Sequence, residues 1–96
     1  MPAALAGMMA LCALSSATPV AAQAPLRVVS MNLCTDQLAM LLADEGQLIS
    51  VSRIATDPRS SAMATQAADY PQNSGLAEEV FLMQPDLVVA GSFTAR

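Results

Sequence analysis

Hydrophobic and polar positions alternate regularly along the chain from residue 26 onward. Three short runs rich in β-branched residues predict strands over 26–31, 48–52 and 87–90. Segments with helical spacing predict helices over 35–43, 61–68 and 77–83, and polar, Pro-containing stretches predict loops over 53–61 and 70–75. Strands that alternate with helices predict an α/β fold, with a parallel sheet and helices on both of its faces.

Two details of the pattern concern packing. The first predicted helix places Leu38, Leu41 and Leu42 on one face, and Asp36 near the positive end of the helix dipole. The run 87–90 is apolar at every position, which is typical of a strand buried on both faces of a parallel sheet.

The first 22 residues differ from the rest of the chain. They include 16 hydrophobic residues and no charged one, and an apolar block over 3–14 is followed by helix breakers and small residues. This order predicts a secretory signal peptide over 1–22, cleaved between Ala22 and Gln23, although no basic residue precedes the apolar block. The alternative is an uncleaved apolar N-terminal helix. After cleavage Cys34 is alone, and we interpret it as a small hydrophobic residue at the start of a helix.

Composition excludes several classes of function. The chain has no His and no Lys, which removes Ser-His-Asp and Cys-His catalysis, Schiff-base chemistry and the phosphate-binding loop lysine. With a net charge of −4 and four scattered arginines, binding to nucleic acid is not expected. The methionines of the body have no common spacing, so they indicate core filling rather than metal ligation: Met31, Met40, Met63 and Met83.

Ligands of open parallel sheets bind beyond the carboxyl ends of the strands. In this chain those ends are predicted at 31–34, 52–54 and 91–93. Three strands and a few helices make up half a lobe, so we expect residues 23–96 to be the truncated N-terminal part of a longer domain.

Three sequence blocks in order resemble a known family. They are RVVSMNLCTDQL at 27–38, VSR at 51–53 followed by DP at 57–58, and GLAEEV at 75–80 followed by QPDLVVAG at 84–91. Together they resemble the N-terminal lobe of periplasmic substrate-binding proteins of iron-siderophore and cobalamin ABC importers. The resemblance implies a two-lobed periplasmic receptor, without enzymatic activity or cofactor, that delivers a ferric siderophore, haem or cobalamin to a permease in the inner membrane.

The resemblance also implies roles for individual residues. Glu78 would dock into an arginine pocket of the permease; the alternative is that Glu78 and Glu79 only complement the helix dipole. Aromatic residues that often line the family's cleft are missing, with Tyr70 and Phe93 the nearest substitutes, while Arg53 and Arg59 could pair with an anionic chelate. The predicted ligand-binding residues lie at the strand ends: Asn32, Leu33, Arg53, Ile54, Asn73, Gly91 and Ser92.

Two other classes of protein are alternatives. One is a small exported α/β interaction protein, and the other is a doubly wound enzyme or signalling domain. The second lacks its usual motifs, because Asn32 to Gln37 stand where a dinucleotide-binding domain needs Gly-x-Gly-x-x-Gly, and no Lys could complete a phospho-acceptor site.

Overall fold

The computed structural model describes residues 23–92, so the predicted signal peptide over 1–22 and Phe93 lie outside the described part of the chain. The described elements, in chain order, are β1 (Val28–Ser30), α1 (Leu33–Leu42), β2 (Leu48–Ser52), the 3₁₀-helix η1 (Arg53–Thr56), α2 (Ala64–Ala67), β3 (Gln72–Asn73), α3 (Ala77–Leu82) and β4 (Leu87–Val89). Among these residues, no helix is both long enough and apolar enough to cross a membrane.

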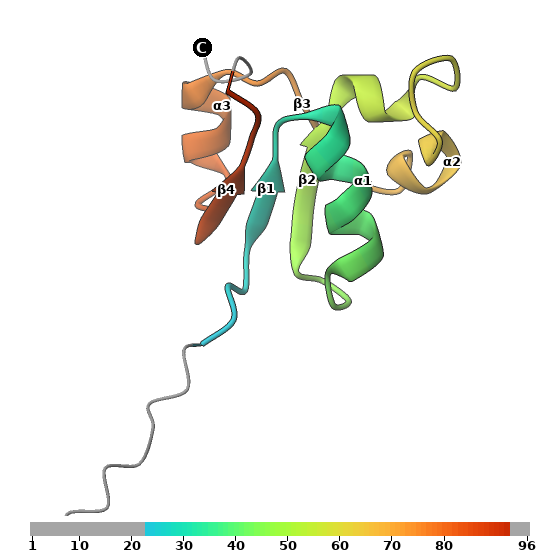
Figure 1. Ribbon diagram of the computed structural model, residues 1–96. Helices are drawn as coiled ribbons and strands as arrows, with labels where there is room; N and C mark the ends of the chain where they lie inside the picture. The colour runs from blue at the N-terminus through green and yellow to red at the C-terminus, as the bar shows by residue number, and fades with distance from the viewer. Residues whose placement is uncertain (1–22, 93–96) are drawn as a thin grey trace, which may run out of the picture.

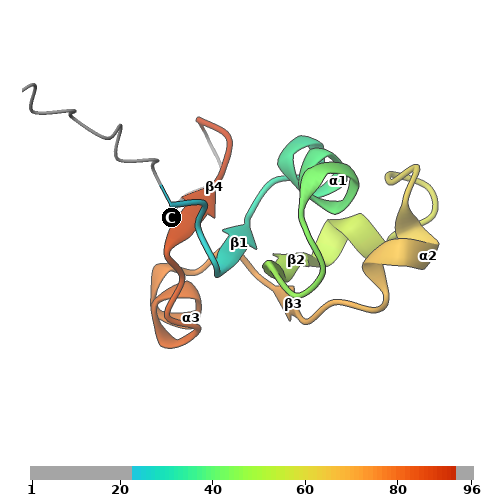
Figure 2. The ribbon, with the colours of Figure 1, turned by 90° about the horizontal axis from the view of Figure 1, so that it is seen from below.

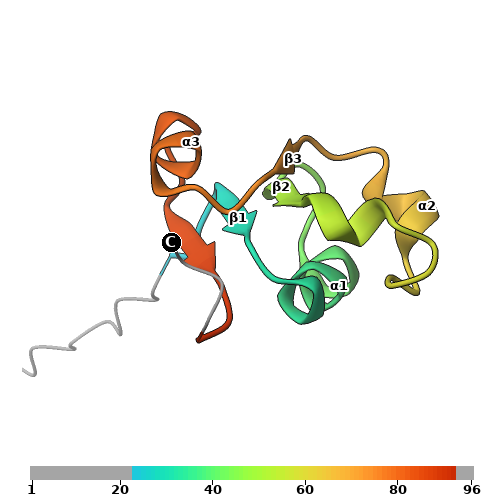
Figure 3. The same ribbon diagram turned by 90° about the horizontal axis from the view of Figure 1, so that it is seen from above.

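The strands form one sheet in the order β3-β2-β1-β4, and every neighbouring pair is parallel. Helices α1 and α3 lie on opposite faces of this sheet, and α2 lies beyond its β3 end (Figures 2 and 3). The structure therefore confirms the predicted α/β fold with flanking helices. Because all strands run in the same direction, their carboxyl ends lie along one edge, which we call the carboxyl edge (Figure 1).

The sequence pattern did not predict the elements that depend on tertiary contacts. Strand β2 spans the predicted residues, whereas β1 and β4 are shorter than predicted. Segment 53–61, predicted as a loop, begins with η1, and segment 70–75 contains β3. Strand β3 has two residues and no strand pattern of its own; it forms because Val51 pairs with Gln72 and Ser52 with Asn73.

Helix α1 begins two residues earlier than predicted because the Asn32 side chain caps it, accepting the Cys34 backbone N–H over 2.9 Å. Its orientation also differs from the sequence-based picture. Asp36 is the buried residue of the helix, whereas the apolar face formed by Leu38, Leu41 and Leu42 is 56%, 68% and 80% exposed. Cys34 lies in the first turn of α1, at the start of the helix as predicted, and it is exposed.

A small hydrophobic cluster covers each face of the sheet. On the α1 face, Val28, Leu48 and Val51 pack with Ala55 and Ala67. On the α3 face, the buried cluster consists of Val29, Met31 and Val80, with Ile49 and Met83 packed against it. A register shift between β1 and β2, where Val28 pairs with Leu48 but Val29 pairs with Ser50, accommodates the additional residue in β2.

The prediction that the last strand is buried on both faces is wrong for the described structure. Leu87 and Val88 of β4 are 42% and 41% exposed. Because consecutive residues of a strand point to opposite faces of the sheet, β4 is accessible on both faces. Strand β4 is an edge strand with β1 as its neighbour on one side, and the nearby Phe81 and Leu82 of α3 are each 79% exposed. The apolar sequence of residues 87–90 is compatible with full burial, but no described residue packs over these side chains closely enough to bury them.

The turn between α3 and β4 is held by charged side chains. The Arg27 guanidinium donates to the carbonyl oxygens of Met83 and Gln84, over 2.6 and 3.1 Å, at the end of the helix. The Asp86 carboxylate accepts the backbone N–H groups of Leu26 and Arg27, over 3.1 and 3.0 Å. Gln84 itself has a positive φ of 52°, the left-handed conformation that commonly ends a helix and that glycine adopts most easily.

We therefore expect Gln84→Gly to raise the free energy of unfolding by about 0.5–1 kcal/mol, because glycine removes the steric cost of the left-handed conformation. The interactions of Arg27 are kept, since they involve the backbone carbonyl of residue 84. The control is Gln66→Gly in α2, which we expect to lower stability by about 1 kcal/mol. Urea denaturation measures both effects; destabilisation by Gln84→Gly would contradict the explanation.

Candidate functional site

The carboxyl edge brings together residues that follow all four strands. Across the sheet, Ser74 follows β3, Arg53 follows β2, Asn32 lies just beyond β1, and Gly91 lies beyond β4. The connection after β1 runs to β2 on one side, whereas the connection after β3 returns to β4 on the other side of β1. The change of direction between β1 and β4 is the position at which open α/β sheets usually bind ligands.

The two predicted ligand-binding residues that follow β1 both contribute to the fold. Asn32 is half-buried, and its side-chain oxygen caps α1 while its backbone oxygen accepts the Thr35 hydroxyl over 3.0 Å. Leu33 is half-buried and packs against the hydrophobic cluster on the α1 face. The amide N–H₂ of Asn32 is the polar group that this segment can offer to a ligand.

Arg53 and Ile54 form the start of η1 at the end of β2. Arg53 is exposed, and one guanidinium nitrogen donates to the Ser74 hydroxyl over 3.1 Å, which connects the ends of β2 and β3. Ile54 is 47% exposed. This segment therefore presents a cationic group with unused donors next to an accessible apolar side chain.

Asn73 is 1% exposed and its amide is fully occupied by other parts of the protein. The nitrogen donates to the Ser30 carbonyl oxygen and to the Ser50 hydroxyl, each over 2.9 Å, and the oxygen accepts the Gly75 N–H over 3.1 Å. These contacts cross three strands at the carboxyl edge. Asn73 therefore connects three strands from within the protein, and its amide is directed at protein groups.

The remaining predicted site residues lie after β4 and on α3. Gly91 is half-buried and Ser92 is exposed, and they are next to the end of β1 because Met31 donates to the Val89 carbonyl over 2.9 Å. Glu78 is exposed on the first turn of α3. Its neighbour Glu79 is half-buried and accepts the Ser74 N–H over 2.8 Å. The two adjacent acids therefore have different surroundings.

Two residues considered as ligand contacts lie elsewhere. Tyr70 precedes β3, at the opposite edge of the sheet, where it helps line a surface hollow with Arg27, Gly46 and Leu48. Arg59 is exposed in the turn after η1, and its backbone N–H donates to Asp57 over 2.9 Å. Only Arg53 of this pair of loop arginines is connected to a second strand end.

The residue at the carboxyl edge that sequence reasoning missed is Asp36. It is fully buried, and both carboxylate oxygens accept hydrogen bonds from Ser52, one from the backbone N–H over 3.1 Å and one from the hydroxyl. A usable signal was present in the helical spacing. The side of α1 that faces the sheet holds the buried Asp36 and three residues packed against the hydrophobic cluster, Leu33, Ala39 and Met40. Leu33, Asp36 and Met40 follow the i, i+3, i+7 spacing of one helix face, with a carboxylate at the middle position.

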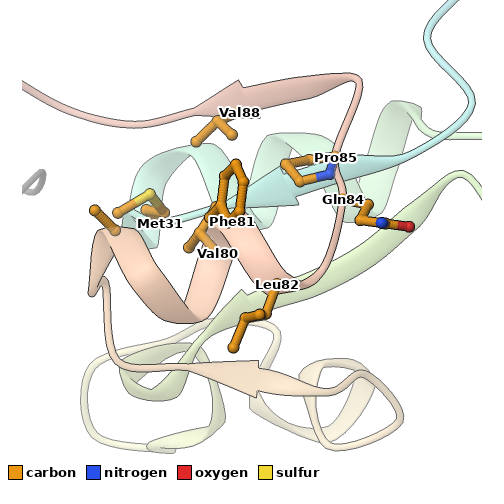
Figure 4. A pocket seen from close by; sticks show the side chains of 8 residues that line it. Met31, Val80, Phe81, Leu82, Gln84, Pro85 and Val88 are labelled. Atoms are coloured by element: carbon orange, nitrogen blue, oxygen red, sulfur yellow. The ribbon is translucent and has the colours of Figure 1, made fainter.

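A separate apolar groove lies between α3 and β4. It has a volume of about 680 Å³, and Phe81 lies in it between the helix and Val88 of the strand (Figure 4). None of the predicted ligand-binding residues lines it, and Gln84 contributes its polar side chain: the lining residues are Met31, Ala77, Val80, Phe81, Leu82, Gln84, Pro85 and Val88. Without a charged group, this groove is not suited to orient an anionic ligand.

No family model, curated protein or solved structure matches this chain. Within residues 23–92, no three His, Cys, Asp or Glu side chains gather in a way that could hold a metal ion. The groups available at the carboxyl edge are therefore the Arg53 guanidinium, hydroxyls and amides.

The structural role of Asn73 predicts a large effect on stability. Asn73→Ala leaves the Ser30 carbonyl, the Ser50 hydroxyl and the Gly75 N–H without their partner, and we expect it to lower the free energy of unfolding by about 2–3 kcal/mol. The exposed neighbour Gln72 is the control, and Gln72→Ala should change stability by less than about 0.5 kcal/mol. Chemical denaturation distinguishes the two; equal effects would mean that the Asn73 network contributes little.

Proposed function

We propose that the chain is the N-terminal lobe of an exported substrate-binding protein, which carries an iron chelate or cobalamin to an ABC importer in the inner membrane. The sequence blocks described above suggest this function. It accounts for the signal peptide predicted over 1–22, and it would place the protein in the periplasm. In such a receptor the carboxyl edge of this sheet forms one wall of the ligand cleft.

The observation that carries the proposal is the position of Arg53. Among the described residues its guanidinium makes one hydrogen bond, to Ser74, and this leaves its other N–H donors for a ligand. A guanidinium held in this way can pair with carboxylate or catecholate oxygens in a fixed geometry. In a protein with a net charge of −4, this local positive charge favours an anionic ferric siderophore over a neutral ligand.

Glu78 supports the second part of the proposal, the delivery of ligand to the permease. Glu79 is engaged by the Ser74 N–H, whereas the described residues provide no hydrogen bond or ion pair to the Glu78 carboxylate. A carboxylate that is exposed on the first turn of a helix can pair with an arginine of another protein without breaking an internal contact. This difference between neighbouring acids is what the docking role requires.

Ligand binding provides the first test. We expect calorimetric titration of the full-length protein with ferric citrate, a catecholate ferric siderophore, haem and cobalamin to detect an anionic iron chelate with a micromolar or lower Kd. Arg53→Ala should weaken binding by about 10- to 100-fold, because it removes a charged hydrogen-bonding group. Phe81→Ser, in the apolar groove, is the matched control and should leave affinity unchanged.

The results separate the alternatives clearly. If none of these compounds binds more tightly than about millimolar, where the binding free energy is only about −4 kcal/mol, the receptor function is wrong. If Phe81→Ser weakens binding and Arg53→Ala does not, the ligand occupies the apolar groove instead of the carboxyl edge.

Transport provides a separate test of the docking role. Glu78→Arg in the full-length protein should reduce uptake of the labelled chelate by about tenfold or more while ligand affinity stays unchanged, because the reversed charge would face the permease arginines. Glu45→Arg makes the same change in charge at an exposed position in the turn between α1 and β2. Normal uptake with Glu78→Arg, or an equal loss with Glu45→Arg, would refute specific docking through Glu78.

A further inference from the structure

Asp36 is bonded to Ser52, the residue that precedes Arg53. Its contacts are unusual for a buried carboxylate. Both of its oxygens accept hydrogen bonds from one residue, Ser52, through the backbone N–H and the hydroxyl. Within residues 23–92 these are the only hydrogen bonds of the carboxylate, and no arginine pairs with it. We infer that Asp36 is a positioning residue for Arg53, an inference that rests on the proposed function.

Burial of the Asp36 charge is expensive, which makes its placement informative. An ionised carboxylate loses its hydration on burial, and two hydrogen bonds from a serine compensate for only part of this loss. An apolar side chain at this position of α1 would extend the hydrophobic cluster formed by Val28, Leu48 and Val51 at lower cost. The carboxylate instead provides acceptors at one location, the end of β2.

The end of β2 determines the position of the Arg53 backbone. Ser52 is the last residue of β2, and η1 starts at the next residue, so the chain changes direction there. Ser52 has an extended backbone, and its side chain does not cap η1 because the hydroxyl is bonded to Asp36. Asp36 therefore fixes the backbone immediately before Arg53 from the α1 side of the sheet.

The guanidinium is held separately, from the β3 side. Ser74 accepts a hydrogen bond from Arg53, and Glu79 in turn accepts the Ser74 N–H. The backbone before Arg53 and the end of its side chain are thus each attached to a different element. An arginine held at both ends loses less conformational entropy when it binds an anion, which increases affinity.

Removal of the Asp36 charge distinguishes positioning from simple electrostatics. If Asp36 acted on an anionic ligand only through its charge, Asp36→Asn would strengthen binding, since a negative charge is lost. If Asp36 positions Arg53, the same substitution weakens binding, and it does so only while Arg53 is present. A purely structural role would weaken binding equally with and without Arg53.

A double-mutant cycle tests the inference in the full-length protein, with the anionic iron chelate that the wild-type protein binds, ferric citrate being the first probe. We expect Asp36→Asn to raise the Kd by about tenfold in the wild-type background and by less than about twofold in the Arg53→Ala background. Ser52→Ala, which keeps the buried charge and the backbone contact, should raise the Kd by about threefold, again only with Arg53 present. Asp44→Asn removes an exposed charge at the other end of α1 and should have no effect.

Each result has a defined meaning. Tighter binding by Asp36→Asn, or equal losses in both backgrounds, overturns the positioning role while the proposed function stands. If Asp36→Asn does not fold, the Ser52→Ala cycle decides the question in the same way. If the wild-type protein binds none of the chelates, the proposed function fails first, and the positioning role fails with it.

Discussion

Parallel pairing of β1 with both β2 and β4 is the constraint on which the rest of the structure depends. Each connection between parallel strands must cross from the carboxyl edge back to the opposite edge, so all the segments that leave the strands begin along one side of the sheet. Residues 21 or more positions apart in sequence, such as Arg53 and Ser74, meet there for this reason. The same constraint requires cover on both faces, which α1 and α3 provide only in part.

Polar side chains connect the strands and helices at the carboxyl edge, where strand pairing ends. Asp36 accepts hydrogen bonds from Ser52 at the end of β2, and Glu79 accepts the N–H of Ser74. Asn73 donates to Ser30 at the end of β1 and to Ser50 in the middle of β2. Among the described residues, no buried side-chain nitrogen or oxygen lacks a hydrogen-bond partner. The contacts of Asp36 and Asn73 are costly to break, since each loss leaves a buried polar group unpaired. In the proposed receptor, these contacts would hold the exposed groups of the carboxyl edge in a defined geometry.

The apolar surface beside β4 contrasts with this polar edge. Leu87, Val88, Phe81 and Leu82 are all accessible, as is the apolar face of α1. Parallel sheets bury both faces in known architectures, and a domain of this size conceals only about 60% of the surface that its unfolded chain exposes. The hydrophobic clusters on the two faces are correspondingly small, so polar contacts at the strand ends are a substantial part of what orders the fold.

Much of the fold could be predicted from local pattern. The β-branched run 48–52 identified β2, and the alternation of strands with helices established the parallel α/β class and the edge at which Arg53 and Asn32 lie. Segments without a local signal were not predictable in this way. Strand β3 exists only through its pairing with β2, and η1 follows from the direction in which the end of β2 is held.

The sequence by itself determined the class of fold, the residues that follow β1 and β2 at the carboxyl edge, and the absence of His and Lys chemistry, because these follow from composition and short-range periodicity. Only the tertiary structure decided which side of α1 faces the sheet. Hydrophobicity favours burial of Leu38, Leu41 and Leu42, but the end of β2 offers donors that a carboxylate can satisfy, and Asp36 is buried instead. That choice depends on residues 16 positions apart, a separation that no helical or strand period spans.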